Sequence, residues 1–314
     1  MEVVSLNSTI YKRKRPLIIF LVPAFLFMGF FLYYPFIINI RNSFMDIPAL
    51  GASANGMNET WYINYQAMLS DTSMQTAMGN TFLAVVCTVV FQVGIALVLA
   101  LLVDNIRRGT QFFRTVYFFP IVISASALGL LFNIIFLYDK GMMNQLLELL
   151  GSDTLVNWKD KAYAIVTMLS PVMWQYVGFY FVIIATGLNN IDAGIYEAAA
   201  IDGASGFQRV FRITLPLLKP VIGTCVVLAT TGALKIFDLP WVMFPNGMPL
   251  ESTWLTGTYM YYQTFLAKNV DYGSAIAVVI VALGIAMSVV VNRIFKDRDE
   301  KVARHKKRDR VTAK

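Results

Sequence analysis

Long apolar runs, separated by shorter polar segments, follow one another along the chain. A helix needs about 20 predominantly apolar residues to cross a bilayer, and irregular backbone is not stable against lipid. Six runs are long enough, and each predicts a transmembrane helix. Their expected bounds are Pro16–Ile40, Thr81–Val103, Phe112–Tyr138, Tyr163–Leu188, Val221–Leu239 and Ser274–Phe295. The pattern therefore predicts an all-α integral membrane protein of about six transmembrane helices.

The first apolar run is interpreted as a retained helix and not as a cleaved signal peptide. A signal peptide has an apolar core of about 7 to 15 residues and a small-residue cleavage site. The run Pro16–Ile40 is longer than such a core, and it follows a basic cluster from Lys12 to Arg15. We therefore expect it to be the first transmembrane helix.

Lys and Arg gather in alternate segments between the runs, which predicts the orientation of the chain. Cytoplasmic loops of membrane proteins are enriched in these residues. If the N-terminus is cytoplasmic, the inner segments carry 20 of the 26 Lys and Arg residues. Tryptophans 61, 158, 241 and 254 then fall in or beside outer loops, at the headgroup level that such rings favour. We expect a basic cytoplasmic segment at 1–15, a transmembrane domain at 16–296, and a basic cytoplasmic tail at 297–314 attracted to membrane lipid.

The composition narrows the class of protein further. Hydrophobic residues make up 57% of the chain, charged residues only 14%, and the mean hydropathy is +0.60. Cys87 and Cys225 lie in apolar runs and the single histidine, His305, lies in the charged tail, which favours neither a metal site nor Ser–His catalysis. The net charge of +7 lies between the spans and at the ends, a pattern typical of membrane topology and not of nucleic-acid binding.

The polar segment between the fourth and fifth runs has an unusual texture. Glu197 and the alanines that follow it favour a helix, whereas Gly203 and Gly206 favour a stop or a turn. A second short helix is expected from about Phe207, ending before Pro216. The predicted structure is a short helix, a glycine turn and another short helix, close to the inner membrane surface.

This segment resembles the signature loop of the membrane subunits of ABC importers. The signature is Glu-Ala-Ala, three residues, Gly, nine residues, Ile, one residue, Leu-Pro, and every fixed position is present with the right spacing. The resemblance implies a type I ABC importer permease fold. It also implies that the loop, about 189–219, holds a coupling helix that docks on an ATPase subunit, with Glu197 facing a basic residue there. The implied coupling residues are Glu197, Ala198, Ala199, Asp202, Gly203, Ile213, Leu215 and Pro216.

More of the chain, from about residue 17 to 296, is similar to the larger membrane subunit of maltose-type transporters. The stretches that carry this likeness begin at Phe112, Phe237 and Asp271. The resemblance implies a bacterial inner-membrane protein that imports a sugar. Its implied partners are a second related permease subunit in a heterodimer, two ATPase subunits and an extracytoplasmic solute-binding protein. ATP and Mg²⁺ would bind the ATPase subunits, so no cofactor is expected on this chain, which has no G-x-x-x-x-G-K-[ST] motif.

Polar and aromatic residues within the fourth and fifth spans are candidates for a substrate pathway. Polar groups are costly in lipid, so they usually face the interior of a helix bundle. Gln175 and Tyr176 could instead form hydrogen bonds between helices, and Lys235 and Asp238 could form a local i,i+3 ion pair. If Lys235 faced the path, it would suit an acidic or phosphorylated sugar. The candidates are Gln175, Tyr176, Phe179, Tyr180, Thr231, Lys235 and Asp238, with Asn80, Gln92 and Asn133 as weaker ones.

Two other classes of membrane protein fit the sequence less well. An ion-coupled secondary transporter usually shows intramembrane carboxylates and repeat symmetry, but here only Asp238 stands out and no repeat is visible. A membrane-embedded enzyme needs a nucleophile, a metal or an acid–base pair at membrane depth, and none converges. The sequence therefore favours a translocation subunit that is not itself an enzyme.

Overall fold

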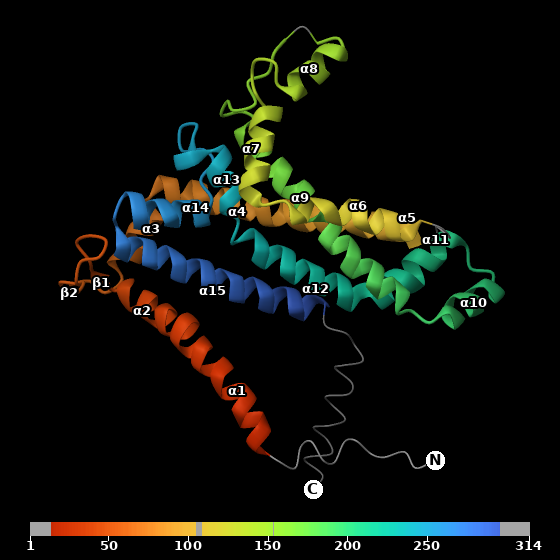
Figure 1. Ribbon diagram of the computed structural model, residues 1–314, viewed down its shortest axis with the longest axis horizontal. Coiled ribbons are helices and arrows are strands. Elements are labelled where there is room, and N and C mark those ends of the chain that lie inside the picture. The colour runs from red at the N-terminus through yellow and green to blue at the C-terminus, as the bar shows by residue number, and fades with distance from the viewer. Residues whose placement is uncertain (1–13, 105–108, 153, 296–314) are drawn as a thin grey trace. The chain divides into compact units, whose positions relative to one another are not determined.

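The computed structural model describes residues 14–104, 109–152 and 154–295, and most of them are helical (Figure 1). The basic tail and most of the basic N-terminal segment lie outside this part of the chain. The chain divides into two compact units, and each is described by itself. The first unit comprises the residues up to Ala67 together with Gln263–Val278, and the second comprises Met68–Tyr262 and the residues from Val279 onward.

The first unit holds the N-terminal span and a small hairpin. Ile18–Asn42 is long and apolar enough to cross a membrane. Its helix changes to π-helical geometry just before Pro35, whose missing N–H would otherwise interrupt the hydrogen-bond ladder. In the hairpin, Met45 pairs with Met57 in antiparallel register. The elements are α1 (Lys14–Met28), η1 (Gly29–Tyr33), α2 (Tyr34–Asn42), β1 (Met45–Asp46), β2 (Gly56–Met57), most of α3 (Ile63–Ser70) and the first turns of α15 (Val270–Phe295).

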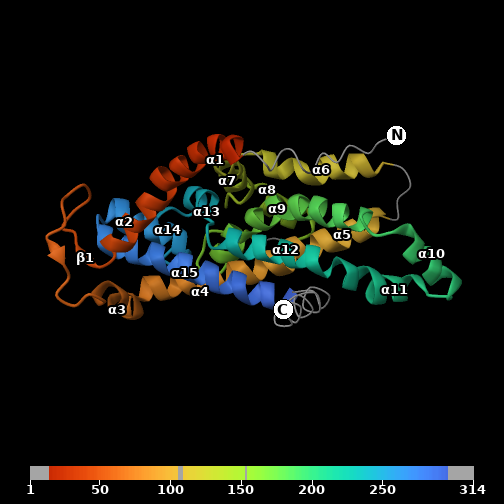
Figure 2. The same cartoon turned by 90° about the horizontal axis from the view of Figure 1, so that it is seen from below.

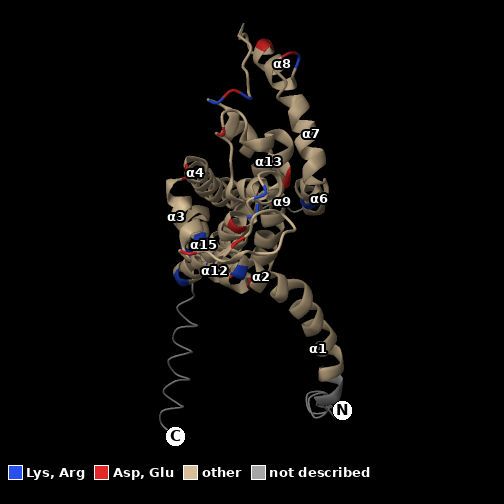
Figure 3. Cartoon of the chain, turned by 90° about the vertical axis from the view of Figure 1, so that its left-hand side faces the viewer, with Lys and Arg blue, Asp and Glu red and all other residues tan. Residues whose placement is uncertain are grey.

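The second unit contains the other candidate spans. Thr72–Asp104, Ala164–Asn189 and Gly206–Met243 each meet the length and apolarity needed to cross a membrane, and Val270–Phe295 does so too. Charged side chains lie mainly in the loops and at helix ends (Figure 3). The elements are α4 (Thr72–Cys87), η2 (Thr88–Val93), α5 (Gly94–Asp104), α6 (Thr110–Val122), α7 (Ala125–Ile135), α8 (Met142–Leu149), α9 (Ala164–Asn189), α10 (Ala193–Ile201), α11 (Gly206–Arg209), η3 (Val210–Thr214), α12 (Leu215–Ala233), α13 (Asp238–Met243), η4 (Pro245–Gly247), α14 (Thr256–Tyr261) and the rest of α15. The short helix η5 (Tyr262–Leu266) starts on the last residue of this stretch and lies otherwise in the first unit.

The predicted third span, Phe112–Tyr138, is not one straight helix. The helices α6 and α7 meet at an angle of 93°, so the described residues give five candidate spans, or six if the bent pair counts as one. The backbone of Ile123 is extended, and Ser124 restarts the helix by accepting a hydrogen bond from the N–H of Ala127. The apolar run continues across the break, so apolarity alone could not reveal it.

The predicted fifth span, Val221–Leu239, is also interrupted. α12 ends at Ala233, and α13 begins only at Asp238, so residues 234–237 are not helical. A turn follows the last residues of α12, and in it the N–H of Lys235 donates to the carbonyl of Gly232 at 3.0 Å. Lys235 is exposed at this break, whereas Leu234 beside it is buried.

Helix α9 forms the centre of the second unit and contacts α5, α6 and α12 (Figure 2). Its side chains Phe181 and Ile184 are completely buried in a cluster that also contains Ala96 and Leu218. Where α6 crosses α9, a Cβ atom on Gly178 would overlap the carbonyl oxygen of Tyr117. Only glycine permits this close approach, which fixes the position of α6 against α9.

Candidate functional site

A cavity of about 310 Å³ lies among the broken spans of the second unit. Helix α9 supplies one wall, the end of α12 and the segment after it supply another, and Thr88, Gln92 and Ala125 complete the lining. The cavity contains all the predicted pathway residues except Thr231. These are Gln175, Tyr176, Phe179, Tyr180, Lys235 and Asp238.

Gln92 and Gln175 both line the cavity, and both also form hydrogen bonds between segments. Gln175 therefore has both of the roles considered for it. Gln92 donates to the carbonyl of Val172 at 2.8 Å, and Gln175 donates to the carbonyl of Ile123 at 3.2 Å. Ile123 lies at the bend between α6 and α7, where the helical ladder is broken. Gln175 therefore stabilises the bend while it lines the cavity, because a buried carbonyl without a partner would be costly.

Tyr176 has only one of the two roles considered for it. Its side chain is 39% exposed and lines the cavity. It forms no hydrogen bond within the described part of the chain, so the helix–helix bond considered for it is absent. The hydroxyl group of Tyr176 is thus available to a molecule bound in the cavity.

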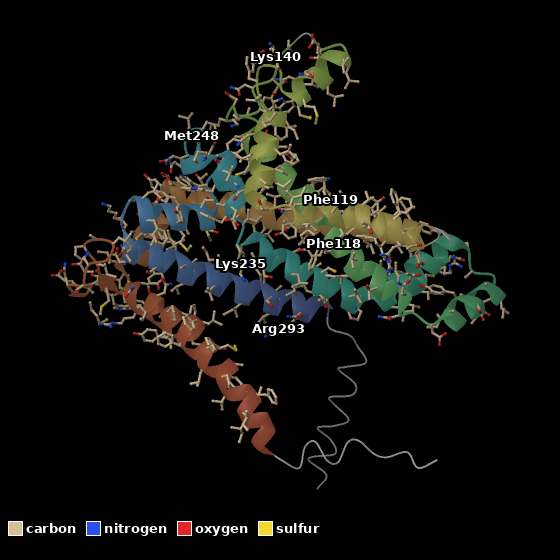
Figure 4. The ribbon with its side chains drawn as sticks, in the orientation of Figure 1. Phe118, Phe119, Lys140, Lys235, Met248 and Arg293 are labelled. Carbon is tan, nitrogen blue, oxygen red and sulfur yellow. The ribbon has the colours of Figure 1, made fainter. Side chains whose placement is uncertain are left out.

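The local ion pair considered as an alternative for Lys235 and Asp238 is absent from the described part of the chain. Within the residues that the structure describes, neither side chain forms an ion pair, and both are exposed in the cavity. The prediction assumed an i,i+3 pair on a continuous helix, but Lys235 lies beyond the end of α12 and Asp238 begins α13 (Figure 4). The cavity therefore contains both a cationic and an anionic group.

Thr231 does not line the cavity. Its hydroxyl donates back to the carbonyl of Val227 at 2.8 Å, as Thr side chains commonly do inside helices. The weaker candidates Asn80 and Asn133 form hydrogen bonds to distant backbone, since Asn80 donates to the carbonyl of Trp254 at 2.9 Å and Asn133 to that of Val242 at 3.4 Å. Sequence reasoning missed Thr88, although its spacing of four from Gln92 would have placed both on one helix face.

The loop with the Glu-Ala-Ala signature lies at the opposite end of the second unit from α13 (Figures 1 and 2). α10 ends in a Schellman motif, in which the N–H of Ala204 donates to the carbonyl of Ala199 at 2.9 Å. The N–H of Gly203 donates to the carbonyl of Ala200 at 3.1 Å, and Gly203 has a φ of +76°. The predicted first helix and glycine turn are thus confirmed.

The second predicted helix of this loop does not end before Pro216. A capping box between Ser205 and Gln208 starts α11, which continues through η3 directly into α12. η3 is π-helical, and the N–H of Leu215 donates to the carbonyl of Val210. This change of hydrogen-bond register accommodates Pro216, which cannot donate to a ladder.

The signature residues differ in exposure. Glu197, Ala198, Asp202, Gly203 and Pro216 are exposed, Ile213 and Leu215 are half-buried, and Ala199 is buried.

Several apolar side chains of the loop are also exposed. Ile201 is 87% and Phe207 72% exposed, and the Phe207 ring lies tilted against that of Phe211 with centroids 4.3 Å apart. Neighbouring exposed apolar side chains are typical of a surface that another protein covers.

Comparison with known proteins agrees with this architecture. Residues 92–300 match the profile of a family described as binding-protein-dependent transport system inner membrane component. The probable ABC transporter permease protein YurN of Bacillus subtilis is 32% identical over 90% of this chain and 96% of that protein. The sulfoquinovosyl glycerol transport system permease protein SmoG of Agrobacterium fabrum is 32% identical over 90% of this chain and 91% of that protein.

A solved structure has a similar fold. It is that of a bacterial ABC transporter involved in the import of the acidic polysaccharide alginate. Its chain matches with a TM-score of 0.78 at 20% identity, covering 91% of this chain and 96% of that one. The resemblance and the fold class inferred from the sequence are confirmed, and the chain belongs to the family of inner-membrane components of binding-protein-dependent transport systems.

Proposed function

We propose that this chain is the permease subunit of an ATP-driven, binding-protein-dependent importer, and that it forms half of the translocation path for a sugar or oligosaccharide. The observation that carries the proposal is the cavity of about 310 Å³, which brings together candidates from two spans. The names of the similar permease SmoG and of the structural neighbour, which refer to a sulfosugar glycoside and a polysaccharide, support a sugar as substrate.

The chemistry of the cavity suits a sugar. Tyr176, Phe179 and Phe237 offer ring faces on which the apolar face of a pyranose can pack. Lys235 can donate to the hydroxyl groups of a sugar and Asp238 can accept from them, because the two side chains do not form an ion pair with each other. A mixture of aromatic faces and few polar groups is typical of small-molecule sites.

The loop from about 189 to 219 is the proposed coupling element. In this proposal α10 docks on a separate ATPase subunit, Glu197 faces a basic residue there, and Ile201 and Phe207 add apolar contact area. The chain itself would bind neither ATP nor Mg²⁺. Two ATPase subunits, a second related permease subunit and an extracytoplasmic binding protein complete the importer, and the family description supports the last of these.

The proposed membrane orientation can be tested by cysteine labelling. We expect an impermeant reagent to modify cysteines placed at Asn58 and Asn157 from outside intact cells. A cysteine at Ser205 should react only after the cells are opened, because the proposed coupling loop is cytoplasmic. Labelling of Ser205 from outside would contradict the orientation and the coupling role together. Cys87 and Cys225, the native free cysteines, would first be replaced with alanine.

The substrate pathway can be tested at Tyr176. We expect Tyr176→Ala to lower sugar uptake by about tenfold, because a well-placed polar and aromatic contact contributes about 1 to 2 kcal/mol. The measurement is sugar uptake by the reconstituted complex, with copurification of all subunits as the check on assembly. Thr231→Val is the matched control, since Thr231 lies on a neighbouring span but does not line the cavity. Unchanged uptake of several sugars by Tyr176→Ala would remove Tyr176 from the pathway.

A further inference from the structure

Three side chains connect α10 to the helix that follows the glycine turn. The guanidinium carbon of Arg209 lies over the ring of Tyr196, 5.6 Å from its centroid. The hydroxyl oxygen of Tyr196 lies 3.2 Å from Oγ1 of Thr214. The hydroxyl of Thr214 in turn donates to the backbone carbonyl of Arg209 at 3.3 Å. These contacts form a closed circuit of three residues, which we call the Tyr196–Arg209–Thr214 latch.

The direction of the hydrogen bonds in the latch follows from the number of protons available. Thr214 has one hydroxyl proton, and it is used in the bond to the carbonyl of Arg209. The hydroxyl of Tyr196 must therefore donate to Thr214. Thr214 is only 4% exposed, and Tyr196 and Arg209 are half-buried, so water competes poorly for these bonds.

The latch spans a turn that the Schellman motif of α10 and the capping box of Ser205 and Gln208 also stabilise. A Cβ atom built on Gly203 would meet no atom within 4 Å, so no side chain packs against the turn at that point. Tyr196 directly precedes Glu197 on α10, and Thr214 directly precedes Leu215, the first residue of α12. The latch thus adds side-chain contacts to the backbone bonds that set the angle between α10 and α12.

α12 joins the latch to the cavity. The helix runs without interruption from Leu215 to Ala233, and its last turns carry Ala229, Gly232 and Ala233, which line the cavity. A displacement of α10 would therefore move the wall of the cavity only if α10 and α12 move as one body. The contacts of the latch join α10 to the segment that leads into α12.

We propose that Tyr196, Arg209 and Thr214 are positioning residues that transmit movement of α10 to α12. The inference rests on the proposed coupling role of α10 and adds to it the path by which the movement reaches the cavity. None of the three residues needs to touch the ATPase or the sugar. Their loss should leave the ATPase subunit bound while less solute is transported for each ATP hydrolysed.

The test uses the complete complex in proteoliposomes, with the solute-binding protein and with uptake and ATP hydrolysis measured together. Tyr196→Phe and Thr214→Val remove the hydroxyl bond with little change in shape, and Arg209→Met removes the cation. We expect each variant to lower the transport-to-hydrolysis ratio by about fivefold, with unchanged copurification of the ATPase. The double variant Tyr196→Phe/Thr214→Val should be no worse than Thr214→Val alone, because Thr214→Val already removes the bond to Tyr196 together with the bond to the Arg209 carbonyl.

Arg209→Lys and Arg212→Met are the controls. Arg209→Lys keeps a cation and should restore most of the ratio. Arg212 is exposed on the same segment and forms no hydrogen bond or ring contact in the described part of the chain, so Arg212→Met should retain the ratio.

The possible outcomes distinguish failure of the latch proposal from failure of the proposed coupling role on which it rests. Normal coupling in all three latch variants, or an equal loss in Arg212→Met, would overturn the latch alone. Release of the ATPase by Arg209→Met would also overturn it, since Arg209 would then be a docking residue. A wild-type complex that contains no ATPase subunit would instead overturn the proposed function.

Discussion

Replacement of Gly203 by valine is expected to abolish coupled solute uptake while membrane insertion stays normal. Gly203 has a φ of +76°, and the Schellman motif at the end of α10 requires this left-handed backbone. Left-handed backbone costs an L-residue about 1 to 2 kcal/mol, and β-branching makes it worse. The turn would open, so α10 and α12 would no longer keep their angle. Uptake and ATPase copurification by the purified complex are the measurements.

Gly206 offers a matched control for this substitution. A Cβ atom on Gly203 or on Gly206 would meet no atom within 4 Å, so neither position lacks space for a side chain. Only Gly203 has a positive φ, since Gly206 begins α11 with ordinary helical geometry. Gly206→Val should therefore keep most of the uptake that Gly203→Val loses. Equal losses at both positions would show that bulk at the surface, and not backbone geometry, is responsible.

The spans themselves could be predicted from the sequence, because the need to satisfy every backbone polar group in lipid leaves few alternatives to a long helix. The breaks within them could not. The apolar run through Ile123 contains Pro120, which can kink a helix, but the 93° bend at Ile123 also depends on a cap at Ser124 and a hydrogen bond from Gln175, 52 residues away in sequence. Tertiary contacts of this kind are invisible to a pattern read along the chain.

The same limit decided the outcome for the candidate site. Polar and aromatic residues on α9 could be chosen because polar groups in spans face the interior, and the cavity contains them. The ion pair of Lys235 and Asp238 failed because it presumed a helix that ends at Ala233. Conversely, Pro216 predicted a helix end that the π-helical segment η3 avoids. A helix break therefore explains the missing ion pair, and a change of hydrogen-bond register explains why the helix continues through Pro216.

Reversal of the charge at Glu197 is expected to release the ATPase subunit from the complex. Glu197 is exposed on α10 and forms no hydrogen bond or ion pair within the described residues, so its carboxylate is available to a partner. Glu197→Ala would lose one attraction to the proposed basic residue and should weaken association by about tenfold. Glu197→Lys would add repulsion between like charges and should weaken it by about tenfold more. The order of the two variants is the diagnostic result, because loss of side-chain bulk alone predicts the opposite.

Copurification of the ATPase with tagged permease variants, followed over a range of salt concentrations, measures this effect. High salt should narrow the difference between Glu197→Lys and Glu197→Ala, because it screens the repulsion but leaves apolar contacts of Ile201 and Phe207 in place. Glu148→Lys is the control, since Glu148 is equally exposed but lies on α8, away from the proposed coupling loop. It should retain the ATPase at every salt concentration. Full retention of the ATPase and of uptake by Glu197→Lys would mean that α10 does not dock through its acidic residue.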